Sequence, residues 1–152
     1  MLYLVDTGVL LRAVDRHCAE HASIMQAFRE LRKRRDSLAV SAQSIREFWN
    51  VSTRPTTARG GYGRTVERTV RWIKSFERFA RILPETPATF ARWRAIAQQH
   101  QVRGVQVHDA NLVAVAEVYG ADAILTLNPR DFSRFSAVRS VTPVQVLAQQ
   151  AP

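Results

Sequence analysis

Four acidic side chains stand where apolar runs end or amphipathic segments begin. They are Asp6, Glu47, Asp109 and Asp131, out of only thirteen acidic residues in the chain. Asp6 is the most informative of them, because it directly follows the apolar run 1–5 and a carboxylate is costly to bury without a partner. Ligands of parallel α/β sheets bind at the carboxyl ends of the strands. The spacing therefore predicts that these carboxylates meet at that edge of a sheet.

Carboxylates that meet in one site favour a bound cation. They repel one another, so at least one binds its proton more tightly unless a cation neutralises the group. Oxygen ligands select hard ions, here Mg²⁺ or Mn²⁺, over Zn²⁺. Such an ion can activate a water and stabilise the charge that builds on a phosphodiester during in-line attack. The residue types therefore predict hydrolysis of phosphodiesters without a protein nucleophile.

Each acid also has an ordinary structural explanation. Asp6 and Asp109 stand where a helix N-cap is expected. Ser44 and Glu47 match the Ser-x-x-Glu capping box, although that box would start the helix late. Asp131 follows an Asn-Pro pair that is typical of a surface turn. Spacing to the other acids is what favours a functional role.

Composition indicates one domain with a polyanionic partner. A chain of 152 residues that is 46% hydrophobic can bury a core of its own, so we expect a single domain over 1–152. A formal net charge of +9 favours nucleic acid. The only cysteine, Cys18, excludes an intramolecular disulfide and suits a reducing compartment. Since no apolar stretch approaches the roughly 18 residues of a membrane span, we expect a cytoplasmic protein.

Apolar runs alternate with amphipathic stretches, which is typical of a mostly parallel sheet between helices. The predicted strands are 2–5, 38–40, 80–83, 123–126 and 138–141. Helical spacing of apolar residues predicts helices around 24–31, 45–49 and 90–97, and a further helix from about Asp109 to Tyr119 that ends at Gly120. The segment 53–63 reads as a turn or mobile loop.

Basic residues recur at helical spacing after this loop. They are Arg64, Arg68, Arg71, Lys74 and Arg78, with Val66, Ile73, Phe76 and Ala80 on the opposite side. The stripe is either a track for RNA phosphates or an ordinary solvated face.

Other polar residues receive auxiliary or structural roles. The Thr7 and Thr126 hydroxyls can hold a carboxylate or a water, although a cap or strand position explains them equally well. His108 is expected to be structural, since adjacent helical residues face apart. His17, Cys18 and His21 lack a fourth partner for a zinc site.

Across its whole length the chain resembles the PIN-domain ribonucleases, and particularly the VapC-like toxins of bacterial toxin–antitoxin pairs. The matching motifs are Val5-Asp6-Thr7, then Ser41-x-x-Ser44-x-x-Glu47-Phe48, then His108-Asp109-Ala110-x-Leu112-x-Ala114, and finally Ile124-Leu125-Thr126-x-Asn128-x-x-Asp131-Phe132. Two positions depart from the family pattern. Gly8 stands where a polar Asn is common, and Asn128 stands where many relatives have an acid, so either Asn128 or Asp131 completes the site.

The resemblance implies a three-layer α/β/α fold with a central, mostly parallel sheet of four to five strands. It implies an Mg²⁺-dependent endoribonuclease, with Asp6, Asp109 and Asp131 as metal ligands and Glu47 as a further catalytic acid. A cognate antitoxin in the acidic groove and a homodimer are implied as well. Two alternatives stay open. A haloacid-dehalogenase-like phosphatase would need a second acid at position 8, and a module that binds RNA without turnover would follow from loss of the fourth acid.

Overall fold

The computed structural model describes residues 1–149, and within them the sheet has five parallel strands. These are β1 (Leu2–Val5), β2 (Ser37–Ser41), β3 (Arg81–Leu83), β4 (Ala123–Leu125) and β5 (Arg139–Val141), in the spatial order β3-β2-β1-β4-β5. This confirms the predicted fold class and places every expected strand within a residue or two. The last three residues of the predicted domain 1–152 lie outside the described part of the chain.

Both faces of the sheet are apolar, and this explains the unbroken hydrophobic runs. Along β1, Tyr3 and Val5 enter one core while Leu4 enters the other, because successive side chains point to opposite faces. On β4, Ile124 shares the core of Leu4. A sheet buried on both faces must be covered by a layer of helices on each side.

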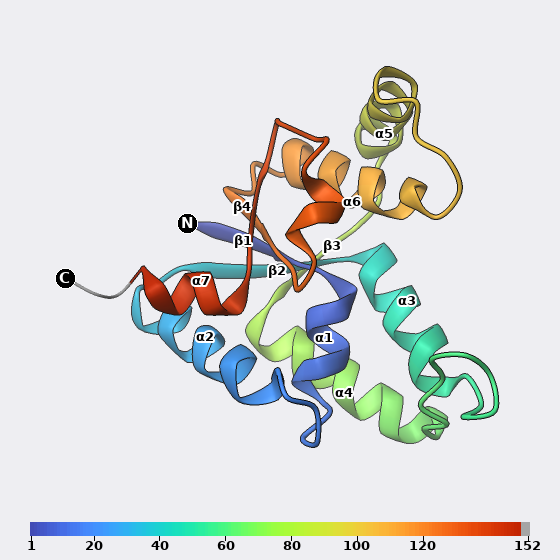
Figure 1. Cartoon of the computed structure of the whole chain (residues 1–152), viewed down its shortest axis with the longest axis vertical. Coiled ribbons are helices and arrows are strands. Elements are labelled where there is room, and N and C mark those ends of the chain that lie inside the picture. Colours follow the sequence, from blue (N-terminus) through green and yellow to red (C-terminus); the bar gives the residue numbers. More distant parts are fainter. Residues whose placement is uncertain (150–152) are drawn as a thin grey trace.

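The helices form those two layers. They are α1 (Thr7–Ala13), α2 (His21–Lys33), α3 (Ala42–Thr53), α4 (Val66–Phe79), α5 (Pro87–Gln99), α6 (Gln106–Val118) and α7 (Pro143–Ala148), with a 3-10 turn η1 (Pro129–Phe132). Residues of α1, α2, α4 and α7 pack into the core with Val5, whereas those of α5, α6 and η1 pack into the core with Leu4. The two groups lie on opposite sides of the sheet (Figure 1). Among residues 1–149, no helix combines the length and apolar character needed to cross a membrane.

Two helices begin earlier than the sequence predicts. The Ser41 side chain caps α3 by accepting a hydrogen bond from the Ser44 amide at 2.9 Å, so the Ser44–Glu47 capping box is wrong and Glu47 lies inside the helix. Helix α6 starts at Gln106, so Asp109 lies in its first turn and is not its N-cap. The predicted stop is confirmed, because Gly120 follows the α6 C-cap with φ +66°. Capping therefore explains neither acid.

The loop predicted at 53–63 runs from Arg54, since α3 ends at Thr53. It is tied back to α3 by hydrogen bonds from the Tyr62 amide to the Val51 carbonyl at 3.1 Å and from the Gly63 amide to the Arg54 carbonyl at 2.8 Å. Gly61 is required here, because a Cβ would lie 2.2 Å from the Pro55 carbonyl oxygen. The loop thus has a defined path that returns the chain to α4.

The packing of the core predicts that truncating Phe48 destabilises the protein much more than truncating Phe90. Phe48 is fully buried, with its ring centroid 5.0 Å from that of Phe76, whereas Phe90 is 58% exposed. We expect Phe48→Ala to lower the free energy of unfolding by about 3–5 kcal/mol through the cavity it leaves. The control Phe90→Ala should cost at most about 1 kcal/mol. Urea unfolding of both variants measures the difference, and equal losses would contradict this packing.

Candidate metal-dependent nuclease site

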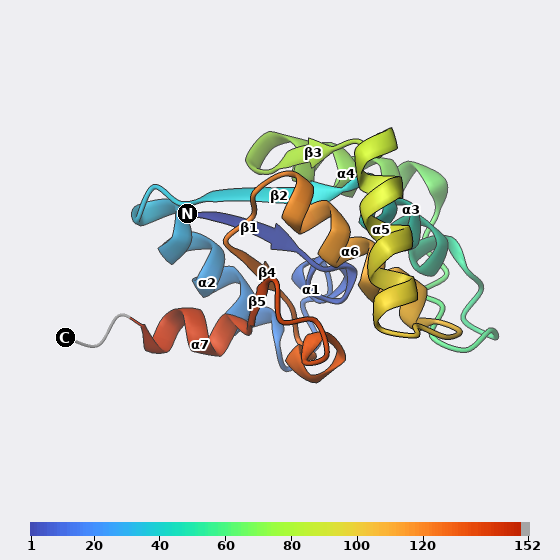
Figure 2. The ribbon, with the colours of Figure 1, turned by 90° about the horizontal axis from the view of Figure 1, so that it is seen from above.

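The predicted site residues gather at the carboxyl ends of the strands. Asp6 follows β1 directly, and Thr126 follows β4. Helices α1 and α3 begin at this edge of the sheet, where β1 and β2 end (Figure 2). Strand β1 pairs with both β2 and β4, so residues 120 positions apart in the sequence become neighbours here.

Asp6 is held by Thr126. The Thr126 hydroxyl donates a hydrogen bond to Asp6 Oδ2 at 2.8 Å, and the same hydroxyl accepts one from the Asn128 amide at 3.1 Å. Thr126 is fully buried, so its orientation is fixed. Asp6 occupies the N-cap position of α1 without a side-chain capping hydrogen bond, but the backbone N–H groups of Thr7 and Gly8 at the start of α1 lower the pKa of its carboxyl. The side chain is therefore held both by Thr126 and by the start of the helix.

Glu47 is oriented by three separate elements. Thr7 on α1 donates a hydrogen bond to Glu47 Oε2 at 2.7 Å, and Gln43, one turn earlier on α3, donates one to Oε1 at 2.6 Å. From α6, His108 Nδ1 lies 3.2 Å from Oε1. Residues four apart share one helix face, so Gln43 and Glu47 point the same way. The Glu47 carboxylate has little freedom to turn.

Asp109 experiences the charges of the other three acids. Partial burial, followed by the negative charges of Asp131, Asp6 and Glu47 in that order, raises its pKa to about 6, while His108 opposes the rise. Burial also raises the pKa of Asp6, against the hydrogen bond from Thr126, and Glu47 adds to the rise. The structure thus brings all four predicted acids into one electrostatic environment, with Asp131 exposed on η1.

The donors suit a hard cation in kind, but they are not gathered around one position. Among residues 1–149, no group of three His, Cys, Asp or Glu side chains is close enough to hold a metal ion. Carboxylate oxygens are the ligands that Mg²⁺ and Mn²⁺ prefer. The raised pKa of Asp109 reflects its burial and then the negative charges of Asp131, Asp6 and Glu47, and a cation would offset those charges. The residues therefore fit a hard cation in donor type and charge, and binding of an ion would have to bring the carboxylates closer together.

Sequence reasoning missed two residues that organise the site. Gln43 donates to Glu47 and, at 3.3 Å, to the His108 carbonyl, and its own side-chain oxygen accepts a hydrogen bond from the Asn111 side chain. The i,i+4 spacing of Gln43 and Glu47 was the available signal. His108, predicted to be structural, is exposed and contacts Glu47 through its ring.

The basic stripe is shorter than predicted. Arg64 precedes Thr65, the N-cap of α4, and so lies outside the helix. The Arg64 guanidinium lies 4.2 Å from the centroid of the Tyr62 ring and donates a hydrogen bond to the Ser52 hydroxyl at 3.3 Å. Arg64 therefore has a structural role in the loop, and Val66, expected on the packed side, is half exposed. The remaining four residues, Arg68, Arg71, Lys74 and Arg78, are exposed on α4.

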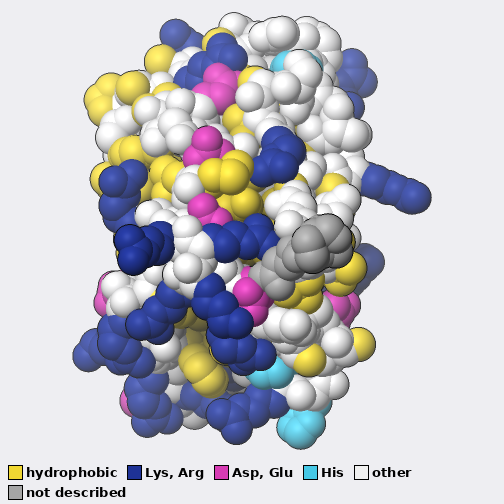
Figure 3. Space-filling view, turned by 90° about the vertical axis from the view of Figure 1, so that its left-hand side faces the viewer, with side chains coloured by type: hydrophobic (Ala, Val, Ile, Leu, Met, Phe, Trp, Pro, Cys, Tyr) yellow, Lys and Arg dark blue, Asp and Glu magenta, His cyan; other side chains and the backbone are white. Residues whose placement is uncertain are grey.

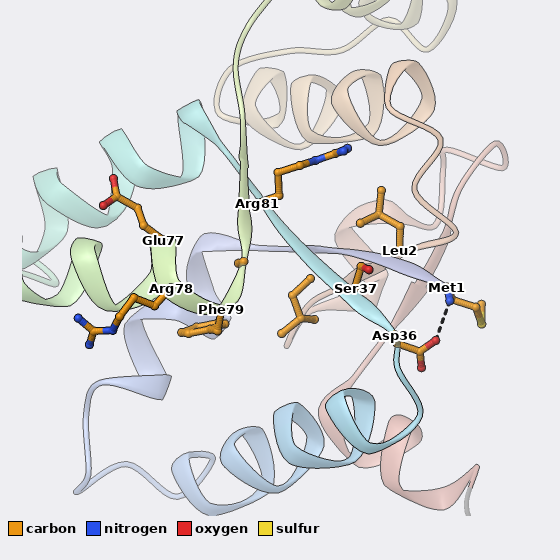
Figure 4. Close-up of a pocket in the computed structure, with 10 residues that line it drawn as sticks. Met1, Leu2, Asp36, Ser37, Glu77, Arg78, Phe79 and Arg81 are labelled. Atoms are coloured by element: carbon orange, nitrogen blue, oxygen red, sulfur yellow. Dashed lines mark hydrogen bonds and ion pairs between the residues drawn. The ribbon is translucent and has the colours of Figure 1, made fainter.

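A separate hollow of about 630 Å³ lies at the opposite end of the strands. It includes Met1, whose amino group pairs with Asp36 at 2.7 Å, together with Phe79 and Arg81 (Figure 4). Lys and Arg side chains surround an apolar hollow on this face (Figure 3). The neighbouring hollow of about 420 Å³ has Phe28 and Phe79 in its lining with Arg29 and Arg78 beside them. Because these surfaces lie at the amino ends of the strands, they are not part of the acid site.

The fold and site define a three-layer α/β/α domain with a carboxylate cluster at the carboxyl edge of a parallel sheet. The family model for the PIN domain matches residues 3–138, and the chain belongs to this family. No curated protein matches significantly.

Solved structures with the same fold include toxin–antitoxin proteins. VapBC2 of Rickettsia felis, bound to a promoter DNA fragment, aligns with a TM-score of 0.70 at 14% identity over 93% of this chain and 98% of that one. DNA-bound VapBC of Salmonella typhimurium aligns with a TM-score of 0.69 at 17% identity over 94% and 99%. VapC20 of Mycobacterium tuberculosis, a Sarcin-Ricin loop cleaving toxin, aligns with a TM-score of 0.59 at 17% identity over 80% and 86%. The VapC-like fold is thus confirmed.

The pKa of Asp109 predicts a pH dependence of stability in metal-free protein. Its folded value of about 6 exceeds the ordinary 3.8, so the folded state binds the proton more tightly and stability falls as pH rises from about 4 to about 6. Asp109→Asn removes this loss. We expect the difference between the melting temperature of Asp109→Asn and that of wild type to become more positive from pH 4 to pH 7. Thermal unfolding in chelator measures both temperatures. A difference that does not change with pH would contradict it.

Proposed function

We propose that the protein is an Mg²⁺-dependent endoribonuclease, with Mn²⁺ as an alternative ion, and that it acts as the toxin of a toxin–antitoxin pair. The observation that carries the proposal is the gathering of four acids at the carboxyl edge of the sheet, where Thr126 holds Asp6 and Thr7 holds Glu47 by hydrogen bonds. Burial and the negative charges of the other three acids raise the pKa of Asp109 there. Four acids from four elements act on one another at the edge where ligands of parallel sheets bind. A structural role would not require that repulsion.

The mechanism assigns each side chain a task. A bound Mg²⁺ or Mn²⁺ ion would supply charge stabilisation at the phosphodiester and a more acidic attacking water. Asp6, Asp109 and Asp131 would hold the ion. Thr126 keeps the Asp6 carboxylate aimed at the site, and Thr7 keeps Glu47 in place. Asp109, with a pKa of about 6, is mostly ionised at neutral pH and becomes fully so once a cation offsets its neighbours.

The ribonuclease and toxin assignments rest on family membership and on the named relatives. VapC20 is a toxin that cleaves the Sarcin-Ricin loop, and the VapBC structures are toxin–antitoxin complexes. A net charge of +9 suits RNA as the substrate. The exposed residues Arg68, Arg71, Lys74 and Arg78 are candidates for phosphate contacts. We propose a cognate antitoxin as the partner, a homodimer as the assembly and the cytoplasm as the location.

The alternatives have less support. The negative charge of Asp131 raises the pKa of Asp109, so a fourth acid acts on the site although Asn128 is neutral. This supports the nuclease over a binding module that has lost its fourth acid. A dehalogenase-like phosphatase would need an acid at position 8, where glycine stands. The backbone N–H of Asn128 donates to the Thr126 hydroxyl at 3.1 Å, a contact that does not involve the Asn128 side chain.

Amide substitutions test the activity. Wild type should cleave structured RNA with Mg²⁺ or Mn²⁺ and not with chelator, and Asp6→Asn and Asp109→Asn should each lose at least about 100-fold, because each weakens the ion that stabilises the transition state. The matched control is Asp122→Asn, an exposed acid whose Oδ2 accepts from the Leu2 amide at 2.6 Å at the amino end of β1. It should retain activity.

Undiminished cleavage by both site variants would refute the mechanism. RNA binding without cleavage by any variant would instead favour the binding module. Hydrolysis of small phosphate esters would favour the phosphatase.

Metal binding is tested without turnover. We expect Mg²⁺ or Mn²⁺ to raise the melting temperature of wild type and of Asp122→Asn, but not of Asp109→Asn, because an ion that binds only the folded state stabilises it. The rise should be larger at pH 7 than at pH 5, where protons compete for Asp109. A shift in Asp109→Asn equal to that of wild type would place the ion elsewhere.

A further inference from the structure

A hollow of about 300 Å³ opens beside the acid site between α3, α5 and α6. One wall is aromatic and consists of Phe90 and Trp93. The other wall is polar and contains Gln43, His108 and Asn111. Its volume is at the lower end of the range for small-molecule sites.

The aromatic wall is exposed but fixed. Phe90 is 58% exposed, and its ring centroid lies 5.6 Å from that of Trp93 at an interplanar angle of 35°. The Trp93 indole N–H donates a hydrogen bond to the Val107 carbonyl at 3.1 Å, which locks the larger ring to α6. The core explains neither the exposure nor the position of Phe90, because the buried residues of α5 are Thr89 and Ile96. An aromatic surface of two tilted rings is therefore open to solvent, with Trp93 anchored to α6.

The polar wall is shared with the acid site. Gln43 and His108 both contact Glu47 Oε1, at 2.6 Å and 3.2 Å. A group seated in the hollow would thus lie next to the residues that orient a predicted catalytic acid. The Gln43 amide is already bonded to Glu47, to the His108 carbonyl and to Asn111. The Asn111 amide and the His108 ring are therefore the groups of this wall that suit hydrogen bonds with the edge of a planar heterocycle.

The charges at the hollow favour a neutral occupant over an anion. Glu47 stands behind the polar wall, and Glu85 at the rim pairs with Arg46 at 2.7 Å. No cationic side chain of the described residues lines the hollow apart from the titratable His108. A phosphate group would meet no fixed positive charge there, whereas an uncharged planar ring could stack on Phe90.

We infer that this hollow holds one unpaired nucleobase of the RNA substrate, stacked on Phe90 and Trp93, with the adjoining phosphate directed toward the acids. The inference rests on the proposed ribonuclease function and names the part of the substrate that its site reads. Bases of single-stranded segments are commonly read by stacking on aromatic side chains and by hydrogen bonds to their edges. The pocket therefore selects single-stranded RNA around the cleavage point and supplies a base preference.

The test separates stacking from cleavage. The affinity of a fluorescein-labelled single-stranded RNA hexamer is measured by anisotropy in chelator, where no cleavage is expected, for wild type and Phe90→Leu. Leucine keeps an apolar side chain but lacks a ring face. The matched control is Phe79→Leu, which alters a 42% exposed phenylalanine on α4 outside the hollow. We expect Phe90→Leu to weaken binding about ten-fold, as loss of one stacked base does, and the control to change it less than about two-fold.

Equal binding by wild type and Phe90→Leu, or no binding by either, would overturn the pocket. So would light scattering that shows Phe90→Leu converting a dimer into a monomer, because a second copy of the chain would then occupy this surface. A Phe90-dependent affinity in a protein that cuts no RNA would leave the pocket standing and refute the nuclease. If Phe90→Leu cleaved RNA at the same rate and the same position as wild type, the nuclease proposal would stand and the base pocket would be refuted.

Discussion

The structure depends on one electrostatic constraint, the mutual repulsion of carboxylates at the carboxyl edge of the sheet. Asp109 is half removed from water and within the field of Asp131, Asp6 and Glu47, which raises its pKa to about 6. Desolvation strengthens such repulsion, so the folded protein loses stability when these groups ionise together. A fold that keeps four acids in this arrangement is suited to a site that receives a cation.

The parallel sheet makes this arrangement possible by joining distant segments. Strand β1 lies between β2 and β4, so Asp6 at the end of β1 contacts Thr126 at the end of β4. Glu47 reaches the same edge from α3, the helix that follows β2. Hydrogen bonds from Thr126 and Thr7 then fix two of the carboxylates. Asp131 is different, because it stands exposed on a short 3-10 turn. The proposed site thus combines carboxylates that hydrogen bonds hold in place with one that is exposed to solvent.

Much of this could be predicted from the sequence because the signals were local. Apolar runs such as 2–5 and 123–126 predicted the strands. The acids that follow such runs predicted that the site lies at the carboxyl edge of the sheet. Contacts between distant side chains were beyond reach. The i,i+4 spacing could have indicated the contact of Gln43 with Glu47, but nothing local to Gln43 shows that it would also join His108 and Asn111. The helix starts were misplaced because Ser41, not Ser44, provides the cap of α3. Arg64 was expected in the helix but precedes α4, and its contacts with Tyr62 and Ser52 are set by the path of the loop.

The most direct test of the central claim is the position of a bound ion. Crystals grown with Mn²⁺ reveal the ion by its anomalous scattering. The account predicts a peak at the carboxyl edge of β1, with oxygens of Asp6, Asp109 and Asp131 at roughly 2.0–2.3 Å, and no such peak in Asp109→Asn. An ion bound elsewhere, or no ion at this edge, would contradict a metal-dependent site formed by these acids.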